Sequence, residues 1–222
     1  YDDSLKNFQK EHNLTIFHLM GQHVNYKLRY RTKQARFWAS SYEDKRPELT
    51  NAQRKMLSHY DNATLYNDSI VAQIVKRFQK QDAIVIYVPD HGEECYEEKR
   101  GFICRNHSAE IDWPLAHYEF EIPFWIYCSP KYIRNHRDIY RQIRKAKDKR
   151  FMTDALPHLL LYLAGIETPT YKEEYNILSP KYDEMRPRIL KNSADYDKLR
   201  DAHLEKIKKE ESKKVKKKER RN

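Results

Sequence analysis

An aspartate and a histidine stand side by side directly after an apolar run in the middle of the chain. The run at residues 84–88 leads through Pro89 into Asp90, His91 and Gly92. In open α/β sheets, ligands bind beyond the carboxyl ends of strands, and a glycine there lets the backbone turn. A carboxylate oxygen and an imidazole nitrogen converging at such a turn can form half of a zinc site. Because zinc takes about four ligands, the pair alone is incomplete, and a helix N-cap beside a solvent-facing histidine is the simpler alternative.

A second group of histidines surrounds the end of another apolar segment. Residues 13–21 read as a buried strand that contains His18, and His23 follows soon after Gly21. His107 lies in a polar stretch further along the chain, where a histidine is ordinarily an unremarkable loop residue. The two strand ends taken together, more than any single histidine, predict a site at one edge of a sheet.

The elements that would position these residues alternate between helix and strand. The sequence predicts, in order, a helix at 1–12, a strand at 13–21, a helix at 50–81, strands at 83–89 and 120–129, and helices at 138–148 and 153–165. This alternation, with a continuous apolar run at 83–89, is typical of an α/β domain with a largely parallel sheet.

Finer features of these elements can also be predicted. The inner face of the long helix is expected to consist of four apolar residues: Leu65, Ile70, Ile74 and Phe78. Pro157 suits the first turn of the last helix, and Gly165 suits its end. The residues between them and the strands, including the stretch 95–117, read as loops.

Composition limits the classes of protein to which the chain can belong. It has 222 residues, of which 34% are charged and 39% hydrophobic, enough for one sizeable core or two small ones. No run reaches the roughly 18 apolar residues of a membrane span. Nothing at Tyr1 resembles a signal peptide, and the absence of an initiator methionine suggests a fragment of a longer protein.

The net charge of +10 is concentrated at the C-terminal end. Residues 204–222 hold ten Lys or Arg and four Glu. The run has no interleaved aromatic residues, so we expect a solvated helix or a disordered arm rather than a nucleic-acid-binding module. A weak affinity for anionic lipid is the functional alternative.

Three cysteines leave the redox state open. Cys95 and Cys104 flank a polar loop and could close it by a disulfide in an oxidising compartment, or remain free. Cys128 lies in an apolar run and is expected in the core.

Four sequence blocks together resemble a known family. "IFHLMGQHVNY", "YDNATLYNDSIV", "IVIYVPDHGEE" and "HYEFEIPFWIY" are similar to blocks of the phosphoethanolamine transferases that modify lipid A and lipopolysaccharide. These enzymes form a branch of the sulfatase and alkaline-phosphatase-like superfamily. The resemblance covers residues 1–129, with a looser similarity to residue 199. It implies an alkaline-phosphatase-like α/β/α sandwich with a largely parallel sheet, incomplete in this chain. Residues 1–190 would be the C-terminal part of the catalytic domain, and residues 191–222 a charged helical or disordered tail.

The resemblance also implies roles for individual residues. Asp90 and His91 match two zinc ligands of the family. His23 and His107 match histidines that line the phosphoryl or substrate pocket and take part in catalysis. His18 matches the first histidine of its block and is expected in a supporting or core position.

Other block residues match without an implied chemical role, and some depart from the family pattern. Residues 60–62 are expected to cap and position the chain, and Glu93 has no expected ligand role. The family commonly has Gly where this chain has Val24, and Ser where it has Glu94. The later His-Gly-Pro sequence appears here as residues 107–109, His-Ser-Ala.

The function implied by the resemblance belongs to a longer parent protein. Zinc and a threonine nucleophile, expected upstream of Tyr1, would move phosphoethanolamine from phosphatidylethanolamine to lipid A or the lipopolysaccharide core. The parent would be held by an N-terminal anchor on the periplasmic side of the bacterial inner membrane, without a nucleic-acid partner. This chain alone is expected to be inactive. The alternatives are another hydrolase of the superfamily, a sulfatase or phosphodiesterase, or a degenerate domain that binds lipid or lipopolysaccharide without catalysis.

Overall fold

The computed structural model describes residues 13–101, 103–106 and 110–219. The helix predicted at 1–12 lies outside the described residues. The chain divides into two compact units, Tyr1–Ile70 and Val71–Asn222, called here the first and second unit. Each unit is described by itself.

The long helix α2, Asn51–Phe78, confirms the helix predicted at 50–81. Its predicted inner face is wrong at Leu65, which is 42% exposed. Within the first unit the buried positions of α2 are instead largely small or polar: Leu57, Ser58, Asn62, Ala63 and Asn67. Polar side chains can be buried there because they find hydrogen-bond partners.

Asn62 shows how such a polar residue is accommodated. Its side-chain oxygen accepts hydrogen bonds from the backbone amides of Arg36, at 2.6 Å, and Phe37, at 3.1 Å. Its side-chain amide donates to the carbonyl oxygens of Phe37 and Ser58, both at 2.8 Å. Asn62 therefore fixes the loop around residue 36 on α2, as a positioning role requires. The capping role expected for residues 60–62 is wrong, because they lie in the interior of α2 and not at its start.

The strand predicted at 13–21 is wrong for the described chain. Residues 13–20 form no regular element, and Leu14, Ile16 and Met20 are 72%, 78% and 59% exposed. A strand needs a neighbour to complete its ladder of hydrogen bonds, and no described segment pairs with this one. The chain turns at Gly21, whose φ is +47°, and continues through three short 3₁₀ helices: η1 (Tyr26–Leu28), η2 (Thr32–Gln34) and η3 (Ala39–Tyr42).

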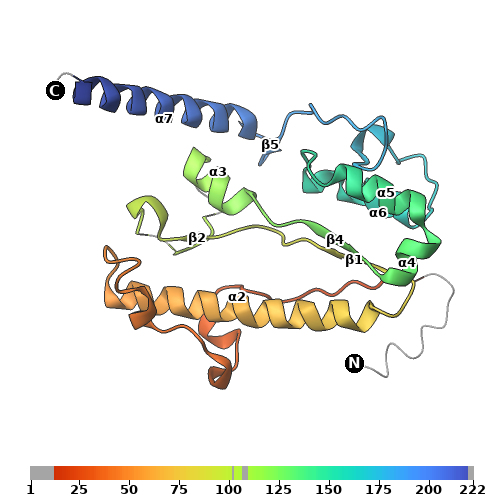
Figure 1. The fold of residues 1–222 in the computed structure, drawn as a ribbon, viewed down its shortest axis with the longest axis horizontal. Helices are drawn as coiled ribbons and strands as arrows, with labels where there is room; N and C mark the ends of the chain where they lie inside the picture. Colours follow the sequence, from red (N-terminus) through yellow and green to blue (C-terminus); the bar gives the residue numbers. More distant parts are fainter. Residues whose placement is uncertain (1–12, 102, 107–109, 220–222) are drawn as a thin grey trace. The chain divides into compact units, whose positions relative to one another are not determined.

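In the second unit, β1 (Ile84–Tyr87) and β4 (Trp125–Cys128) form a two-stranded ribbon (Figure 1). Both strands confirm predicted ones, but they run antiparallel, with Ile84 opposite Cys128, where the sequence predicts a largely parallel sheet. The intervening residues 88–124 do not cross back over the ribbon. They fold beyond its end and return beside it, so the second strand must run in the opposite direction.

Residues 88–124 contain structure where the sequence predicts mainly a loop. Strands β2 (Glu94–Cys95) and β3 (Ile103–Cys104) pair as an antiparallel hairpin around η4 (Glu97–Lys99), and helix α3 follows at Trp113–Phe120. Asp112 caps α3 by accepting a hydrogen bond from the Leu115 amide at 3.0 Å. The predicted loop is therefore wrong here, because a local cap starts a helix too short to show a clear apolar period.

The register of the hairpin bears on the cysteines. Cys104 lies opposite Glu94, whereas Cys95 lies opposite Ile103. Neighbouring positions on a strand point to opposite faces, so the two thiols project away from each other, and no disulfide joins any of the three cysteines in the described chain. Cys128 is buried, which confirms its predicted place in the core.

A hydrophobic core lies on one side of the ribbon. It contains the buried residues Ala146, Leu159, Ile177 and Leu178, with Phe124 and Ile126 packed against them. The helices around it are α4 (Pro130–Asn135), α5 (Arg137–Ala146) and α6 (Leu156–Leu163), with η5 (Thr153–Ala155) before α6 and η6 (Glu173–Tyr175) after it. Helices α5 and α6 confirm the predictions at 138–148 and 153–165, including Pro157 in the first turn of α6.

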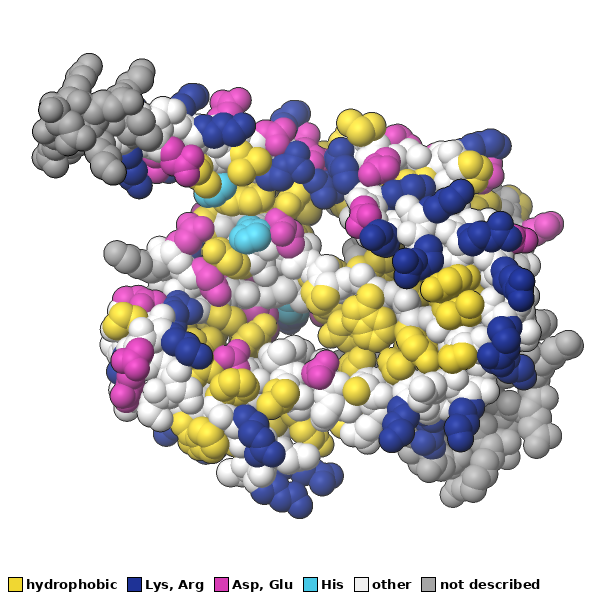
Figure 2. All heavy atoms as spheres, in the orientation of Figure 1, with side chains coloured by type: hydrophobic (Ala, Val, Ile, Leu, Met, Phe, Trp, Pro, Cys, Tyr) yellow, Lys and Arg dark blue, Asp and Glu magenta, His cyan; other side chains and the backbone are white. Residues whose placement is uncertain are grey.

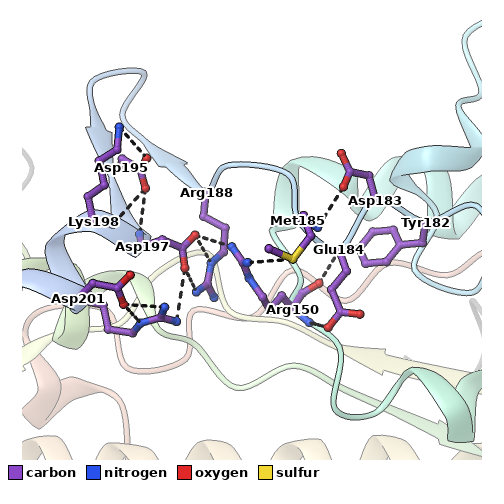
Figure 3. A network of polar contacts seen from close by, with 11 residues as sticks. Arg150, Tyr182, Asp183, Glu184, Met185, Arg188, Asp195, Asp197, Lys198 and Asp201 are labelled. Atoms are coloured by element: carbon purple, nitrogen blue, oxygen red, sulfur yellow. Dashed lines mark hydrogen bonds and ion pairs between the residues drawn. The ribbon is translucent and has the colours of Figure 1, made fainter. Parts of the chain in front are cut away.

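The end of the chain is the charged helix α7, Tyr196–Glu219, in the stretch for which the sequence predicts a helix or a disordered arm. It follows the short hairpin of β5 (Ile189–Leu190) and β6 (Ala194–Asp195). Asp197 in its first turn receives guanidinium groups from Arg150 and Arg188 (Figure 3). The domain boundary at residue 190 stays a prediction. Across the described residues, none of the helices combines the length and the apolar character needed to cross a membrane.

Candidate metal half-site

Asp90 and His91 lie together where the chain leaves β1. The Asp90 Oδ2 atom is 3.6 Å from the His91 Nε2 atom. The Asp90 side chain is 86% exposed and that of His91 is 21% exposed. The residues that follow are not helical, so the alternative of a helix N-cap is wrong. The two side chains lie close together, and their role as metal ligands stays a prediction.

The hydrogen bonds of His91 select one tautomer. Its Nδ1 atom lies 2.7 Å from the carbonyl oxygen of Gly92, which can only accept, so Nδ1 carries the proton. Its Nε2 atom contacts Nη1 of Arg105, which can only donate, so Nε2 offers its lone pair. Both contacts suit the same tautomer. In this tautomer, Nε2 is the ring nitrogen with a lone pair that a metal ion could accept.

Gly92 is required by the close approach of α3. Its amide donates to the carbonyl oxygen of Glu119 at 2.7 Å. A Cβ atom on Gly92 would lie 2.2 Å from the carbonyl oxygen of Tyr118. No side chain fits in that space, so the turn after His91 packs directly against the backbone of the helix.

A buried carboxylate lies two residues further on. Glu94 is fully buried, and its Oε2 atom accepts from Nε of Arg100 at 2.8 Å. In the described part of the chain, its Oε1 atom has no hydrogen-bond partner. Burial raises the pKa of Glu94, and the charge and hydrogen bond of Arg100 only partly oppose this. Arg100 also binds Asp112, the cap of α3, at 2.7 Å.

The pair opens onto a groove of about 980 Å³ in the second unit. Asp90, His91 and Glu119 line one part of it, and apolar residues such as Phe124 and Ile126 line another. The remaining lining includes six basic residues: Arg144, Lys147, Lys149, Arg150, Arg188 and Lys191. Figure 2 shows apolar side chains gathered over the β1–β4 ribbon, with Lys and Arg side chains around them on the side of α5. The groove thus combines an apolar surface with positive charge.

The other histidines remain without a demonstrated role. His23 is exposed in the first unit, where its Nδ1 atom lies 3.3 Å from the carbonyl oxygen of Val24 and its own carbonyl accepts from Arg29 at 2.9 Å. His18 is also exposed, so its expected core position is wrong. His107 lies outside the described residues. The catalytic roles of His23 and His107 stay predictions.

The donor set fits zinc in part. A carboxylate and an unprotonated imidazole nitrogen are ordinary zinc ligands, of which zinc takes about four. Among the described residues, however, no group of three or more His, Cys, Asp and Glu side chains could hold a metal ion. Asp90 and His91 can therefore supply two positions of a site, and the described chain does not complete it.

Two residues of this site could not be found from the sequence. Arg105, which contacts His91, and Glu119, which contacts Gly92, belong to stretches without a recognisable motif of their own. The only available signal is that Glu119 lies within the block "HYEFEIPFWIY", so its neighbourhood carries the resemblance although its role does not.

Comparisons with known proteins agree on a family. A family model described as Sulfatase matches residues 1–166. The phosphoethanolamine transferase EptC of Escherichia coli strain K12 is 31% identical over 194 residues, which are 83% of this chain and 32% of that protein. The Kdo(2)-lipid A phosphoethanolamine 7''-transferase of the same strain is 30% identical over 141 residues, 62% of this chain and 23% of that protein.

Solved structures show the same similarity. The C-terminal periplasmic domain of EptC from Escherichia coli, in complex with zinc, matches with a TM-score of 0.64 and 28% identity. The match covers 81% of this chain and 50% of that domain. The chain thus spans about a third of the curated relative EptC and half of its solved domain.

Proposed function

Because this chain belongs to the sulfatase family, we propose that it is part of a zinc-dependent phosphoethanolamine transferase that modifies lipid A or lipopolysaccharide. The observation that carries the proposal is the Asp90–His91 pair, which presents two zinc-type donors in a chain whose relatives bear that activity in their names. A related periplasmic domain in complex with zinc supports the choice of metal.

The chemistry assigned to this chain is that of holding and orienting. Zinc, when bound, supplies positive charge that polarises a phosphoryl oxygen and activates a hydroxyl nucleophile. Asp90 would contribute a negative oxygen ligand, and His91 would contribute the Nε2 lone pair that its Gly92 contact leaves available. His23 and His107 would stabilise charge on the phosphoryl oxygens or protonate the leaving group.

The groove beside the pair supports a lipid-like substrate. Its apolar residues can contact acyl chains, and its basic residues can contact phosphate groups. The proposed donor is phosphatidylethanolamine, and the proposed acceptor is lipid A or the lipopolysaccharide core. The nucleophile would be a threonine supplied from outside this chain. The protein would work on the periplasmic side of the bacterial inner membrane, held there by an N-terminal anchor.

The test is to replace each proposed ligand in the full-length protein. Asp90→Ala and His91→Ala should abolish transfer of phosphoethanolamine from phosphatidylethanolamine to lipid A, followed by mass spectrometry, and should lower the bound zinc. Asp138→Ala is a matched control, because Asp138 is an exposed carboxylate on α5 that pairs with Arg141 at the surface. Normal transfer by either ligand variant would contradict the assignment.

A second candidate is another hydrolase of the superfamily, because the matching family model is described only as Sulfatase. A sulfatase or phosphodiesterase would use the same two ligands with another substrate. Cleavage of an aryl sulfate or an aryl phosphodiester by the full-length protein, without transfer to lipid A, would favour it. Full-length protein that binds no stoichiometric zinc would favour a non-catalytic lipid-binding domain.

A further inference from the structure

Glu119, near the end of α3, makes two separate contacts with the chain around the candidate site. Its carbonyl oxygen accepts from the amide of Gly92 at 2.7 Å. Its Oε1 atom accepts from the amide of Asn106 at 2.6 Å. Glu119 is 3% exposed and lies in the lining of the groove with Asp90 and His91. One buried residue thus joins two segments that are distant in sequence.

The two segments meet again at His91. Gly92 is the immediate neighbour of His91 and accepts the proton of its Nδ1 atom. Asn106 is the immediate neighbour of Arg105, which donates to the Nε2 atom of the same ring. Glu119 is therefore connected through Gly92 to Nδ1 of His91, and through Asn106 and Arg105 to Nε2 of the same ring.

The contact between the Gly92 backbone and helix α3 leaves little freedom to move. The Gly92 backbone packs against the carbonyl oxygen of Tyr118 with no space for a Cβ atom. Leu115 and Ala116, on the same helix, are fully buried. A buried carboxylate that loses its hydrogen-bond donor is strongly unfavourable, so the Asn106 amide is held firmly at Glu119.

We propose that Glu119 is a positioning residue for the candidate zinc site. Its main chain fixes the turn that carries Asp90 and His91, and its carboxylate fixes the segment that carries Arg105. Together they hold the His91 ring in one orientation, with Nδ1 at the Gly92 carbonyl oxygen and Nε2 at Arg105. A metal ion and Arg105 cannot share one lone pair, so binding of zinc releases Arg105 from Nε2. This inference rests on the proposed function in assigning zinc to His91.

The variants separate the effect of the length of the Glu119 side chain from the effect of its charge. Glu119→Gln removes the charge but keeps an oxygen that can accept from the Asn106 amide. Glu119→Asp keeps the charge but is one methylene shorter. Glu119→Met keeps the length, removes the acceptor and suits an apolar groove, so it serves if the Asp variant fails to fold. Glu110→Gln removes an exposed carboxylate from the same part of the chain and is the matched control.

Three measurements are made on the full 222-residue chain. Nitrogen-15 chemical shifts of the His91 ring report its tautomer without any metal. Hydrogen exchange reports the protection of the Gly92 and Asn106 amides. Titration with Zn²⁺ alone, followed at His91, reports the relative affinity. Thermal unfolding of each variant shows that it is folded.

We expect Glu119→Gln and Glu110→Gln to keep the His91 tautomer and zinc affinity within about threefold of the parent chain. Glu119→Asp and Glu119→Met should mix the two tautomers and speed hydrogen exchange at Asn106. A loss in the Gln variant at least as large as that in the Asp variant would show that the charge of Glu119 matters as well as its length and would overturn the inference. Parent-like behaviour of both the Asp and the Met variants would also overturn it.

Failure of the proposed function gives a different result. If Zn²⁺ causes no shift at His91 in the parent chain, this half-site does not bind zinc by itself, and the activity of the Asp90 and His91 variants decides the function. The inference about Glu119 is then decided by the tautomer and hydrogen-exchange measurements, which involve no metal.

Discussion

Two carboxylates of the second unit, the half-buried Asp197 and the fully buried Glu94, differ in how many arginines they bind. Asp197 receives Arg188 at both oxygens, at 2.5 and 3.2 Å, is also contacted by Arg150, and lies 3.4 Å from Arg200 (Figure 3). Glu94 is more deeply buried but binds one arginine through one oxygen. Asp197 thus has three arginines around it, whereas Glu94 has one.

The pKa values of the two groups differ accordingly. Hydrogen bonding from Arg188 and the surrounding positive charge lower the pKa of Asp197, although burial opposes them. Burial raises the pKa of Glu94 in spite of Arg100. Asp197 therefore attaches the start of α7 to Arg150 and Arg188. The charge of Glu94, beside the candidate site, is only partly compensated by Arg100. Such exceptions to full pairing tend to occur near functional sites.

Removal of the fully paired carboxylate should have the largest effect. Asp197→Ala leaves the partly buried Arg150 and Arg188 without their common partner, so we expect a loss of about 3 kcal/mol in the free energy of unfolding. Urea denaturation measures it. Asp201→Ala is the control, because Asp201 is 63% exposed and its pair with Arg200 lies at the surface; it should cost less than about 0.5 kcal/mol. Equal losses of unfolding free energy in the two variants would show that Asp197 does not hold α7 in place.

On the Glu94 side, stability should depend on close packing more than on charge. Gly92→Ala places a Cβ atom against the backbone of α3, and we expect a loss of about 2 kcal/mol because neither backbone can yield easily. Gly101→Ala is the matched control. Gly101 has a φ of +68° but nothing within 4 Å of its Cβ position, so only the backbone strain of about 1 kcal/mol is expected. A smaller loss at Gly92 than at Gly101 would contradict the close packing.

The two carboxylates should also respond to pH in opposite directions. The pKa of Asp197 is lowered in the folded state, so its stabilising contribution is present above its unfolded pKa of about 3.9 and is lost as pH falls through the folded value. The pKa of Glu94 is raised, so its contribution is present below its unfolded pKa of about 4.3 and is lost as pH rises through the folded value.

Glu94→Gln tests this difference directly. Because it removes the ionisation of a buried group, it should raise the stability at pH 7 by about 1 kcal/mol relative to its effect at pH 4. Asp197→Asn should lose more stability at pH 7 than at pH 3. Denaturation curves at the three pH values measure both, and slopes of the same sign for the two variants would remove the distinction between them.

The smallest effect is expected from removal of the charged residues after the first turns of α7. Deletion of residues 204–222 leaves Asp197 and His203, whose ring stacks on Trp113 at 5.2 Å, in place. The free energy of unfolding should therefore change by less than about 0.5 kcal/mol. If the basic run binds anionic lipid, sedimentation with vesicles containing phosphatidylglycerol should fall on deletion, and binding by the parent chain should weaken with salt. Loss of stability would place residues 204–222 within the folded core.

Much of the second unit could be predicted from the sequence, for local reasons. The apolar runs at 84–87 and 125–128 and the turn residues Pro157 and Gly165 determine elements without reference to distant parts of the chain. The antiparallel order of the ribbon could not be predicted, because it depends on where residues 88–124 fold. Helix α3 was too short to show a period, although Asp112 and Pro114 are typical of a helix start.

The site was predictable only in its central pair. Asp90 and His91 are adjacent in sequence, so a single turn brings them together. Arg105 and Glu119 reach the same place through the hairpin and α3, and nothing local in the sequence indicates those contacts. The segment 13–20 failed for the opposite reason: its apolar composition is typical of a strand, but a strand requires a partner.

The candidate site lies within the loop that the antiparallel ribbon closes, which bears on the order of folding. Pairing β1 with β4 requires the closure of the long loop 88–124, and the entropy cost of closing a loop rises with its length. The β2–β3 hairpin and α3 form mainly from local contacts, and they shorten the loop that remains to be closed. His91 contacts Arg105, and Gly92 contacts Glu119, within this same loop, so Asp90 and His91 can reach their arrangement together with the hairpin and α3, before the ribbon pairs.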